Sequence, residues 1–263
     1  MLSDNSFVRR VENGRLVWYR RAADAVFWDE HWAVQISDEL YEKAEQGELG
    51  YFKDIFTEYL PTEGRILEAG CGSAYHVLAL RQRGYDIEGI DWAERTIKQV
   101  VSIRPDLPVT VGDVTCLAVP DHWYSAYISL GVVEHLFDGP LPVLAEAWRV
   151  LKPGGVALIS VPNFNVLRRI KAFLGLYGHI PQELEFYQYA FRESEFDALL
   201  YQSGFSVLRH FHYSGFKCVN DELPVLQKLT KVPVLWKLVD MFYKATWLDE
   251  KFGHMTMAIC RKR

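Results

Sequence analysis

An acid and two glycines stand where a short apolar segment ends. Glu68, Gly70 and Gly72 follow the segment that begins at residue 65. Because glycine lacks a Cβ, it accepts positive φ angles and lets a ligand approach the backbone closely. Open α/β sheets bind ligands where a strand ends and the next helix begins. We therefore expect residues 65–74 to form a buried strand, a tight turn and a helix start that together hold a ligand.

Two more acids follow apolar segments downstream. Asp91 ends the segment 86–91, and Asp113 comes directly after 109–111. An acid at the end of a second strand can accept both hydroxyls of a ribose. Each such charge-assisted hydrogen bond contributes about 1.5–3 kcal/mol. Either acid alone fits a simple helix cap equally well, but the two together with the glycine turn favour a nucleoside-binding edge.

These residues need a framework of alternating strands and helices to bring them together. The apolar segments typical of strands lie at residues 65–68, 86–91, 109–111, 124–130, 156–161, 205–211 and 255–260. Helical spacing of apolar residues lies between them, at 50–60, 75–82, around 97–101 with a stop near Pro105, at 142–151 and at 193–202. This alternation predicts βαβ units and a parallel sheet with right-handed crossovers. The sequence Lys152-Pro153-Gly154-Gly155 predicts a sharp turn.

The N-terminal residues have a different pattern. Residues 1–14 end in the turn signal Asn13-Gly14 and fit either a short hairpin or a frayed end. Residues 15–50 are rich in aromatics at roughly helical spacing, which suits either a cap over a ligand pocket or a helix packed on the core. The aromatic residues are Trp18, Tyr19, Phe27, Trp28, His31 and Trp32.

Two insertions, at about 164–190 and 217–252, interrupt the later part of the pattern. In the first, apolar residues alternate with Arg168, Arg169 and Lys171, as in an interfacial amphipathic helix. The second is expected to be helical and contains Leu235, Trp236, Leu238, Val239, Phe242 and Tyr243. Together these insertions could admit a lipid-linked substrate from a membrane surface. The alternatives are that they form a lid over a small soluble substrate or a contact in a dimer.

Composition narrows the possible partners. The net charge of −5 gives no general nucleic-acid footprint, whereas residues 163–263 carry 14 Lys and Arg against 10 Asp and Glu. Four cysteines without a CxxC pair indicate a reducing compartment and no zinc site. We find neither the apolar core of a signal peptide nor a run of about 18 apolar residues. We therefore expect a cytoplasmic protein without a transmembrane helix or a metal.

The chain resembles the class I S-adenosylmethionine-dependent methyltransferases, in particular the bacterial branch that acts on small molecules, lipids or glycan intermediates. The matching motifs are residues 67–73, 89–91, 112–113, 129–136 and 151–155. The resemblance implies an α/β fold with a Rossmann-like, mostly parallel seven-stranded sheet, helices on both faces, an antiparallel last strand and helical cap insertions. It further implies an N-terminal cap at residues 1–50 and a methyltransferase domain at residues 51–263.

The resemblance also implies roles for single residues. The methionine end of S-adenosylmethionine, and of the product S-adenosylhomocysteine, is expected on Glu68, Gly70, Cys71 and Gly72. The ribose and adenine are expected on Asp91, Trp92, Asp113 and Val114, and the sulfur end on Leu130 and Gly131. The family usually has glycine where this chain has Ala74.

Methyl transfer to a hydroxyl needs a base, and His135 is the best candidate. It follows the fourth strand, in the loop that faces the transferred methyl group in this fold, and its ordinary pKa suits proton removal. The alternative is that the Glu134-His135 pair only shapes the loop. The weaker candidates for contact with the acceptor are Tyr19, Trp32, His76, Tyr187 and Tyr189.

These features predict methyl transfer by in-line displacement to O or N of a small-molecule, lipid-linked or glycan-type acceptor. A monomer or a homodimer is expected, with no nucleic acid as partner and with possible peripheral membrane contact. A catalytically inactive or regulatory S-adenosylmethionine-binding protein is the first alternative. An NAD-dependent dehydrogenase is less favoured, because its motif needs glycine where Tyr75 stands and Glu68 would repel a diphosphate.

Overall fold

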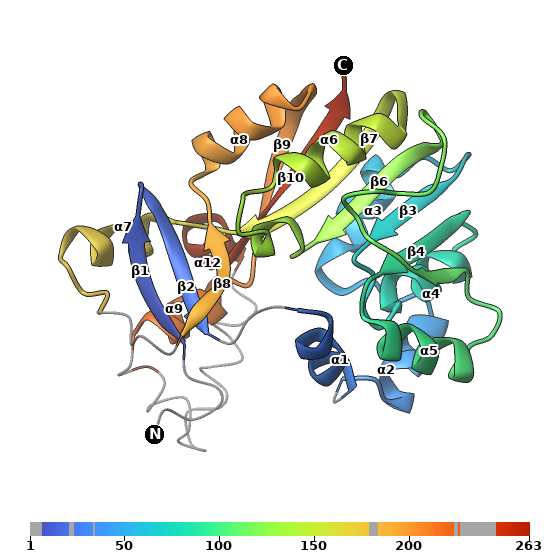
Figure 1. Cartoon of the computed structure of the whole chain (residues 1–263), viewed down its shortest axis with the longest axis horizontal. Helices are drawn as coiled ribbons and strands as arrows, with labels where there is room; N and C mark the ends of the chain where they lie inside the picture. Colours follow the sequence, from blue (N-terminus) through green and yellow to red (C-terminus); the bar gives the residue numbers. More distant parts are fainter. Residues whose placement is uncertain (1–6, 21–23, 34, 179–183, 224–225, 227–245) are drawn as a thin grey trace.

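A seven-stranded sheet forms the centre of the computed structural model, which describes residues 7–20, 24–33, 35–178, 184–223, 226 and 246–263 (Figure 1). The strand order is β5-β4-β3-β6-β7-β10-β9. Strands β3 to β7 pair in parallel, and β10 (Met255–Lys262) runs antiparallel to both of its neighbours, β7 and β9 (Phe205–Tyr213). The predicted fold class is confirmed.

The strands that position the site begin and end close to the predicted residues. They are β3 (Ile66–Ala69), β4 (Ile87–Asp91), β5 (Val109–Val111) and β6 (Tyr124–Leu130). Strand β3 is buried along its whole length, as expected for a strand at the centre of a parallel sheet that is covered on both faces. The carboxyl ends of these four strands therefore meet along one edge of the sheet.

The predicted sharp turn at residues 152–155 is wrong. Strand β7 runs from Leu151 to Pro162 and passes through these residues. Its pairing with β6 shifts from Tyr124–Leu151 to Ala126–Val156, which leaves extra residues on β7. A bulge of this kind lets a strand stay paired on both sides of an irregular segment. Gly154, at φ +73°, provides the backbone conformation that the bulge requires.

Helices cover both faces of the sheet (Figure 1). One core forms under α2 (Asp38–Glu45), α3 (Lys53–Tyr59), which follows the 3₁₀ turn η1 (Gly50–Phe52), α4 (Tyr75–Gln82) and α5 (Glu94–Ile103). The second core forms under α6 (Leu141–Val150) and α8 (Glu193–Gln202). The predicted helices at 75–82 and 193–202 are confirmed to the residue.

A second, antiparallel sheet of three strands lies to the left of the central sheet in Figure 1, in the order β1-β2-β8. Its strands are β1 (Val8–Glu12), β2 (Arg15–Arg20) and β8 (Glu185–Ala190). The hairpin interpretation of Asn13-Gly14 is confirmed. The helical interpretation is wrong for Trp18 and Tyr19, which lie on β2, because pairing with β1 and β8 decides their conformation. It is confirmed for the aromatics of α1 (Ala25–Ala33).

Within the residues that the structure describes, three short helices lie in or next to the insertions: α7 (Val166–Phe173), α9 (Gly215–Glu222) and α12 (Thr246–Phe252). The helix predicted in the first insertion is confirmed. The apolar stretch that includes Leu235 and Phe242 lies outside the described residues. No helix in the described part of the chain is long and apolar enough to cross a membrane.

Glu222 joins these outer elements to one another. Its buried carboxylate pairs with Arg9 of β1 and with Arg168 and Lys171 of α7, the last at 2.8 Å. Arg168 is itself fully buried and also donates to the carbonyl oxygen of Asn163, just beyond β7, at 2.6 Å. This ion-pair cluster fixes α7 and the hairpin relative to the carboxyl end of β7.

Candidate functional site

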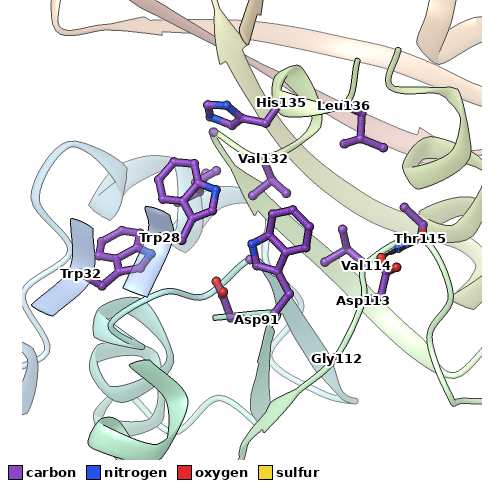
Figure 2. A pocket seen from close by; sticks show the side chains of 14 residues that line it. Trp28, Trp32, Asp91, Gly112, Asp113, Val114, Thr115, Val132, His135 and Leu136 are labelled. Atoms are coloured by element: carbon purple, nitrogen blue, oxygen red, sulfur yellow. Dashed lines mark hydrogen bonds between the residues drawn. The ribbon is translucent and has the colours of Figure 1, made fainter. Parts of the chain in front are cut away.

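A pocket of about 200 Å³ opens at the carboxyl ends of β3, β4, β5 and β6 (Figure 2). Figure 2 shows Trp28 and Trp32 on one side of it and Asp113, Val114 and Thr115 on the other. Its lining consists of Trp28, Trp32, Gly70, Asp91, Trp92, Gly112, Asp113, Val114, Thr115, Leu130, Gly131, Val132, His135 and Leu136. Seven of the ten residues expected to hold the cofactor are among them: Gly70, Asp91, Trp92, Asp113, Val114, Leu130 and Gly131.

Asp91 is held in one orientation by backbone hydrogen bonds. Its Oδ2 accepts from the N–H of Gly72 at 2.8 Å, and its Oδ1 accepts from the N–H of Ala93 at 2.9 Å. Burial raises the pKa of this carboxyl, and the two backbone donors oppose that effect. Each carboxylate oxygen keeps a second acceptor position. Asp91 can therefore accept two further hydrogen bonds from a diol at the pocket edge.

The glycine loop is packed tightly against its neighbours. A Cβ on Gly70, at φ +82°, would lie 2.3 Å from Cγ2 of Val132. A Cβ on Gly72, at φ +49°, would lie 2.4 Å from the indole of Trp32. Ala74 adopts the left-handed conformation, at φ +58°, at the position where the resembling family usually has glycine. The chain thus keeps the tight turn at that position without a glycine.

Three expected cofactor residues, Glu68, Cys71 and Gly72, do not line the pocket. Glu68 is buried, and its Oε1 lies 3.1 Å from Nδ1 of His76. Its Oε2 has no hydrogen-bond partner in the described structure. Burial, together with the nearby charges of Glu68 and Asp91, raises the pKa of the Cys71 thiol well above its usual value, so this cysteine is an uncharged packing residue.

The opposite wall is formed by the loop after β5. Oδ1 of Asp113 accepts from the N–H and the hydroxyl of Thr115, both at 2.7 Å. Trp92 is 48% exposed at the rim, so a large part of its ring surface is free for contact. Thr115 was not among the predicted site residues. Its position two residues after a strand-end acid is the signal that could have identified it.

Helix α1 supplies the aromatic wall. Trp28 and Trp32 are four residues apart, so they lie on the same face of the helix, and both line the pocket. Oδ1 of Asp29 accepts from the N–H and the hydroxyl of Thr96, at 2.8 and 3.0 Å, which fixes α1 on α5. Trp28 was not among the predicted site residues, although its spacing from Trp32 indicated a shared face.

His135 lies in the pocket wall, on the 3₁₀ turn η2 (Val133–His135). Its Nδ1–H donates to the carbonyl oxygen of Tyr187 at 2.8 Å, so Nε2 carries the lone pair when the ring is neutral. The rings of Trp28 and Tyr187 pack against it, each with its centroid 4.9 Å away. Burial lowers the pKa of His135 to about 4.

Among the predicted acceptor residues, Trp32 lines the pocket and the other four do not. Tyr187 lies behind His135 as its hydrogen-bond acceptor and ring contact. The hydroxyl of Tyr189 donates to the carbonyl oxygen of Phe137 at 2.9 Å. His76 is paired with Glu68, and burial raises the pKa of Tyr19, on β2, to about 12. The structure therefore brings Trp32 and His135 together and leaves these four residues outside the pocket lining.

Residues 67–159 match a protein family described as a methyltransferase domain, and they contain Asp91, Asp113 and His135. This part of the chain is therefore similar to a methyltransferase domain. In a protein of Mycolicibacterium smegmatis described as a probable S-adenosylmethionine-dependent methyltransferase, 98 residues are 35% identical to this domain. The match covers 37% of this chain and 38% of that relative. In Pseudomonas fluorescens, a ubiquinone biosynthesis O-methyltransferase is 26% identical over 151 residues, which are 54% of this chain and 65% of the relative.

Solved structures share the fold of the methyltransferase domain over more of the chain. The Haloferax volcanii structure of a putative methyltransferase with the activator Trm112 aligns with a TM-score of 0.60 and 17% identity. It covers 91% of this chain and 97% of the other. A Thermotoga maritima S-adenosylmethionine-dependent methyltransferase, described as a possible histamine N-methyltransferase, aligns with a TM-score of 0.53 and 19% identity, covering 90% and 96%. S-adenosylmethionine is the methyl donor named for several of these proteins.

Proposed function

We propose that this chain transfers a methyl group from S-adenosylmethionine to an oxygen or nitrogen of a small-molecule or lipid-linked acceptor. The observation that carries the proposal is the fixed carboxylate of Asp91 at the edge of the pocket, held by the N–H groups of Gly72 and Ala93. It presents free acceptor positions beside a backbone turn that has no Cβ at Gly70. This arrangement suits a ribose followed by a short aliphatic chain.

The residues present fit the rest of the cofactor. Asp113, Val114 and Trp92 form the wall where the adenine would lie. Glu68 lies outside the pocket lining, and its buried carboxyl, with Oε2 unpartnered, would act on the ammonium group of the methionine end through its charge rather than by contact. Gly131, at φ +71°, offers backbone on the side where the sulfur would lie. A diphosphate would instead meet the negative charges of Glu68 and Asp91, which disfavours a dinucleotide.

S-adenosylmethionine, when bound, supplies a methyl group that is already activated by a positive sulfur. The protein has to align the acceptor with that group and keep water out. Trp28, Trp32 and Leu136 provide apolar walls for this purpose. The carbonyl oxygen of Tyr187 holds His135 with Nε2 unprotonated, so that Nε2 can take the proton of an acceptor hydroxyl.

Two observations support a lipid-linked acceptor and peripheral membrane contact. Helix α7 and the residues after it expose large apolar side chains: Val166 at 46%, Ile170 at 52%, Phe173 at 90%, Leu174 at 59% and Leu176 at 60%. A Pseudomonas relative is named for ubiquinone biosynthesis, and ubiquinone is a lipid. The exposed face also carries Arg169, which suits an anionic headgroup.

Titration calorimetry with S-adenosylmethionine and S-adenosylhomocysteine tests the cofactor assignment. We expect both to bind, and Asp91→Ala to weaken binding about 10–100-fold, a loss of about 1.4–3 kcal/mol. Asp106→Ala, at an exposed position outside the pocket lining, is the matched control and should bind as the wild type does. The absence of heat with the wild type, or an Asp91→Ala variant with unchanged affinity, would refute the assignment.

A further inference from the structure

Glu134, next to His135, is a buried acid that has no role in the cofactor site or in proton removal as described for His135. It lies on η2, and its side chain is 2% exposed. Its Oε1 lies 3.9 Å from Nε2 of His135, the nitrogen that carries the lone pair. Its Oε2 has no hydrogen-bond partner in the described structure. Burying a carboxyl with an unpartnered oxygen costs free energy, so the position calls for a functional explanation.

The carboxyl lies directly behind the backbone that lines the pocket. A Cβ on Gly131 would lie 3.5 Å from Oε1 of Glu134 and 3.8 Å from the terminal methyl group of Met255. Gly131 itself lines the pocket, at the expected sulfur end. Because Gly131 has no side chain, only its backbone separates the Glu134 carboxyl from the pocket. Glu134 is therefore close to the reaction centre although it is shielded from solvent.

Several other ionisable groups act on this pair from neighbouring elements. Burial, and to a smaller extent the charge of Glu134, raises the pKa of Tyr187 on β8 and of Tyr213 on β9. Arg20 of β2 acts on Tyr187 in the opposite direction. After burial, the charge of His31 on α1 also lowers the pKa of His135. Both tyrosines are neutral near pH 8, so of these groups Glu134 is the one whose pKa lies there.

We propose that Glu134 is a positioning residue that makes His135 basic during methyl transfer. The inference rests on the proposed function. The acceptor oxygen forms a bond to the methyl carbon, the carbon–sulfur bond breaks, and its electron pair stays on sulfur. The proton of the acceptor hydroxyl goes to Nε2 of His135. The resulting imidazolium faces the carboxylate of Glu134 across 3.9 Å and is stabilised by it.

The protonation states of the two groups agree with this geometry. Burial lowers the pKa of His135 to about 4, so the imidazole alone is a poor base at neutral pH. Burial raises the pKa of Glu134 to about 8, and its own backbone N–H partly offsets this. As pH falls through this value Glu134 gains a proton, and its support for His135 decreases. Above pH 8 its carboxylate stabilises the imidazolium, and the two groups titrate as a coupled pair.

The test is an NMR titration of the full chain, labelled with ¹³C at Glu Cδ and at the His rings, in the presence of S-adenosylhomocysteine. We expect the Glu134 signal to titrate with a midpoint near pH 8 and the His135 ring signals to shift over the same range. In Glu134→Gln, the His135 shift near pH 8 should disappear. Glu94→Gln, on the exposed side of α5, is the matched control and should keep it.

Three outcomes distinguish the claims. A Glu134 midpoint below pH 5, or a His135 signal that ignores the Glu134 titration, overturns the inference, and this wild-type measurement needs no variant to fold. Calorimetry on the same samples reports S-adenosylhomocysteine binding, which Glu134→Gln should leave within about twofold of the wild type. If the wild type does not bind S-adenosylhomocysteine, the proposed function fails. If the protein binds S-adenosylhomocysteine but Glu134 titrates at the ordinary pKa of a glutamate, only the role of Glu134 is refuted.

Discussion

The indole of Trp32 lies so close to Gly72 that a Cβ there would be 2.4 Å from the ring. This contact joins helix α1, which is N-terminal to the central sheet, to the glycine loop after β3. The N–H of the same glycine donates to Asp91. Gly72 therefore contacts both Trp32 of the aromatic wall and the carboxylate of Asp91, and a substitution at Gly72 should disturb both.

We expect Gly72→Ala to weaken S-adenosylhomocysteine binding more than tenfold. The new methyl group must displace Trp32, and an L-residue in the left-handed region adds strain of about 1–2 kcal/mol. Gly84→Ala is a matched control, because Gly84 has φ +88° but no atom lies within 4 Å of the position that its Cβ would take. Calorimetry and thermal unfolding of both variants separate the contact from the strain. Equal losses of affinity in the two variants would contradict this expectation.

A double-mutant cycle with Gly72→Ala, Trp32→Ala and the double variant tests the same contact through its effect on S-adenosylhomocysteine affinity. If the clash with the indole causes the loss, the second substitution should recover part of the affinity that the first removes. Residues in contact couple by about 0.5–3 kcal/mol in such cycles. Additive effects on the S-adenosylhomocysteine dissociation constant would show that Trp32 and Gly72 act independently.

We expect His135→Ala to slow methyl transfer while cofactor affinity stays within about twofold of the wild type. A positioned base contributes about 10²–10⁴-fold to the rate. The measurement is transfer of tritium from labelled S-adenosylmethionine to an extract of host-cell lipids and metabolites, with calorimetry in parallel. His122→Ala, which removes a histidine outside the pocket lining, is the control. A fully active His135→Ala enzyme would remove this residue as the base.

The Glu222 ion-pair cluster should be essential for stability. Burial pushes the pKa of Glu222 up, but Arg9, Lys171 and Arg168 outweigh that effect and lower it. A carboxyl with a lowered folded pKa stabilises the protein above its unfolded pKa, near 4.3, and that contribution is lost as pH falls through the folded value. We expect Glu222→Gln to cost about 3–5 kcal/mol at pH 7, since it leaves buried cations unpaired.

Urea unfolding at pH 7 and at pH 3.5 checks this expectation for Glu222. The difference between Glu222→Gln and the wild type should shrink at the lower pH, where the native carboxyl begins to be protonated. Glu94→Gln removes an exposed pair with Lys98 and should have little effect at either pH. A Glu222→Gln difference that does not depend on pH would show that packing, rather than charge, is the cause.

Local sequence signals predicted the central sheet, because each strand and helix between residues 65 and 150 has its own apolar period and its own turn. The expected site residues Asp91, Asp113 and His135 share the pocket because parallel strands end on one edge. The β1-β2-β8 sheet could not be predicted in this way. It pairs Leu16 with Ala190, and nothing in either segment specifies a partner so far away in the sequence.

The same limit explains the errors inside the site. Tyr187 and Tyr189 are both aromatic residues of β8, but the register of that strand decides which group each one presents. Tyr187 offers its backbone carbonyl oxygen to His135, and the Tyr189 hydroxyl is used by Phe137. The environment of Glu134 could not be predicted either, because the tyrosines that its charge affects lie on β8 and β9, far away in the sequence.

Helix α7 provides the last prediction. Phe173 is 90% exposed, and burying a side chain of this size stabilises binding by about 1.5–3 kcal/mol. We therefore expect Phe173→Ser to weaken binding to phosphatidylglycerol vesicles about 10–100-fold in a sedimentation assay. Tyr201→Ser, which changes a 65% exposed aromatic residue on α8, should bind as the wild type does. If the wild type stays in the supernatant at every vesicle concentration, α7 does not contact a membrane and a soluble acceptor is favoured.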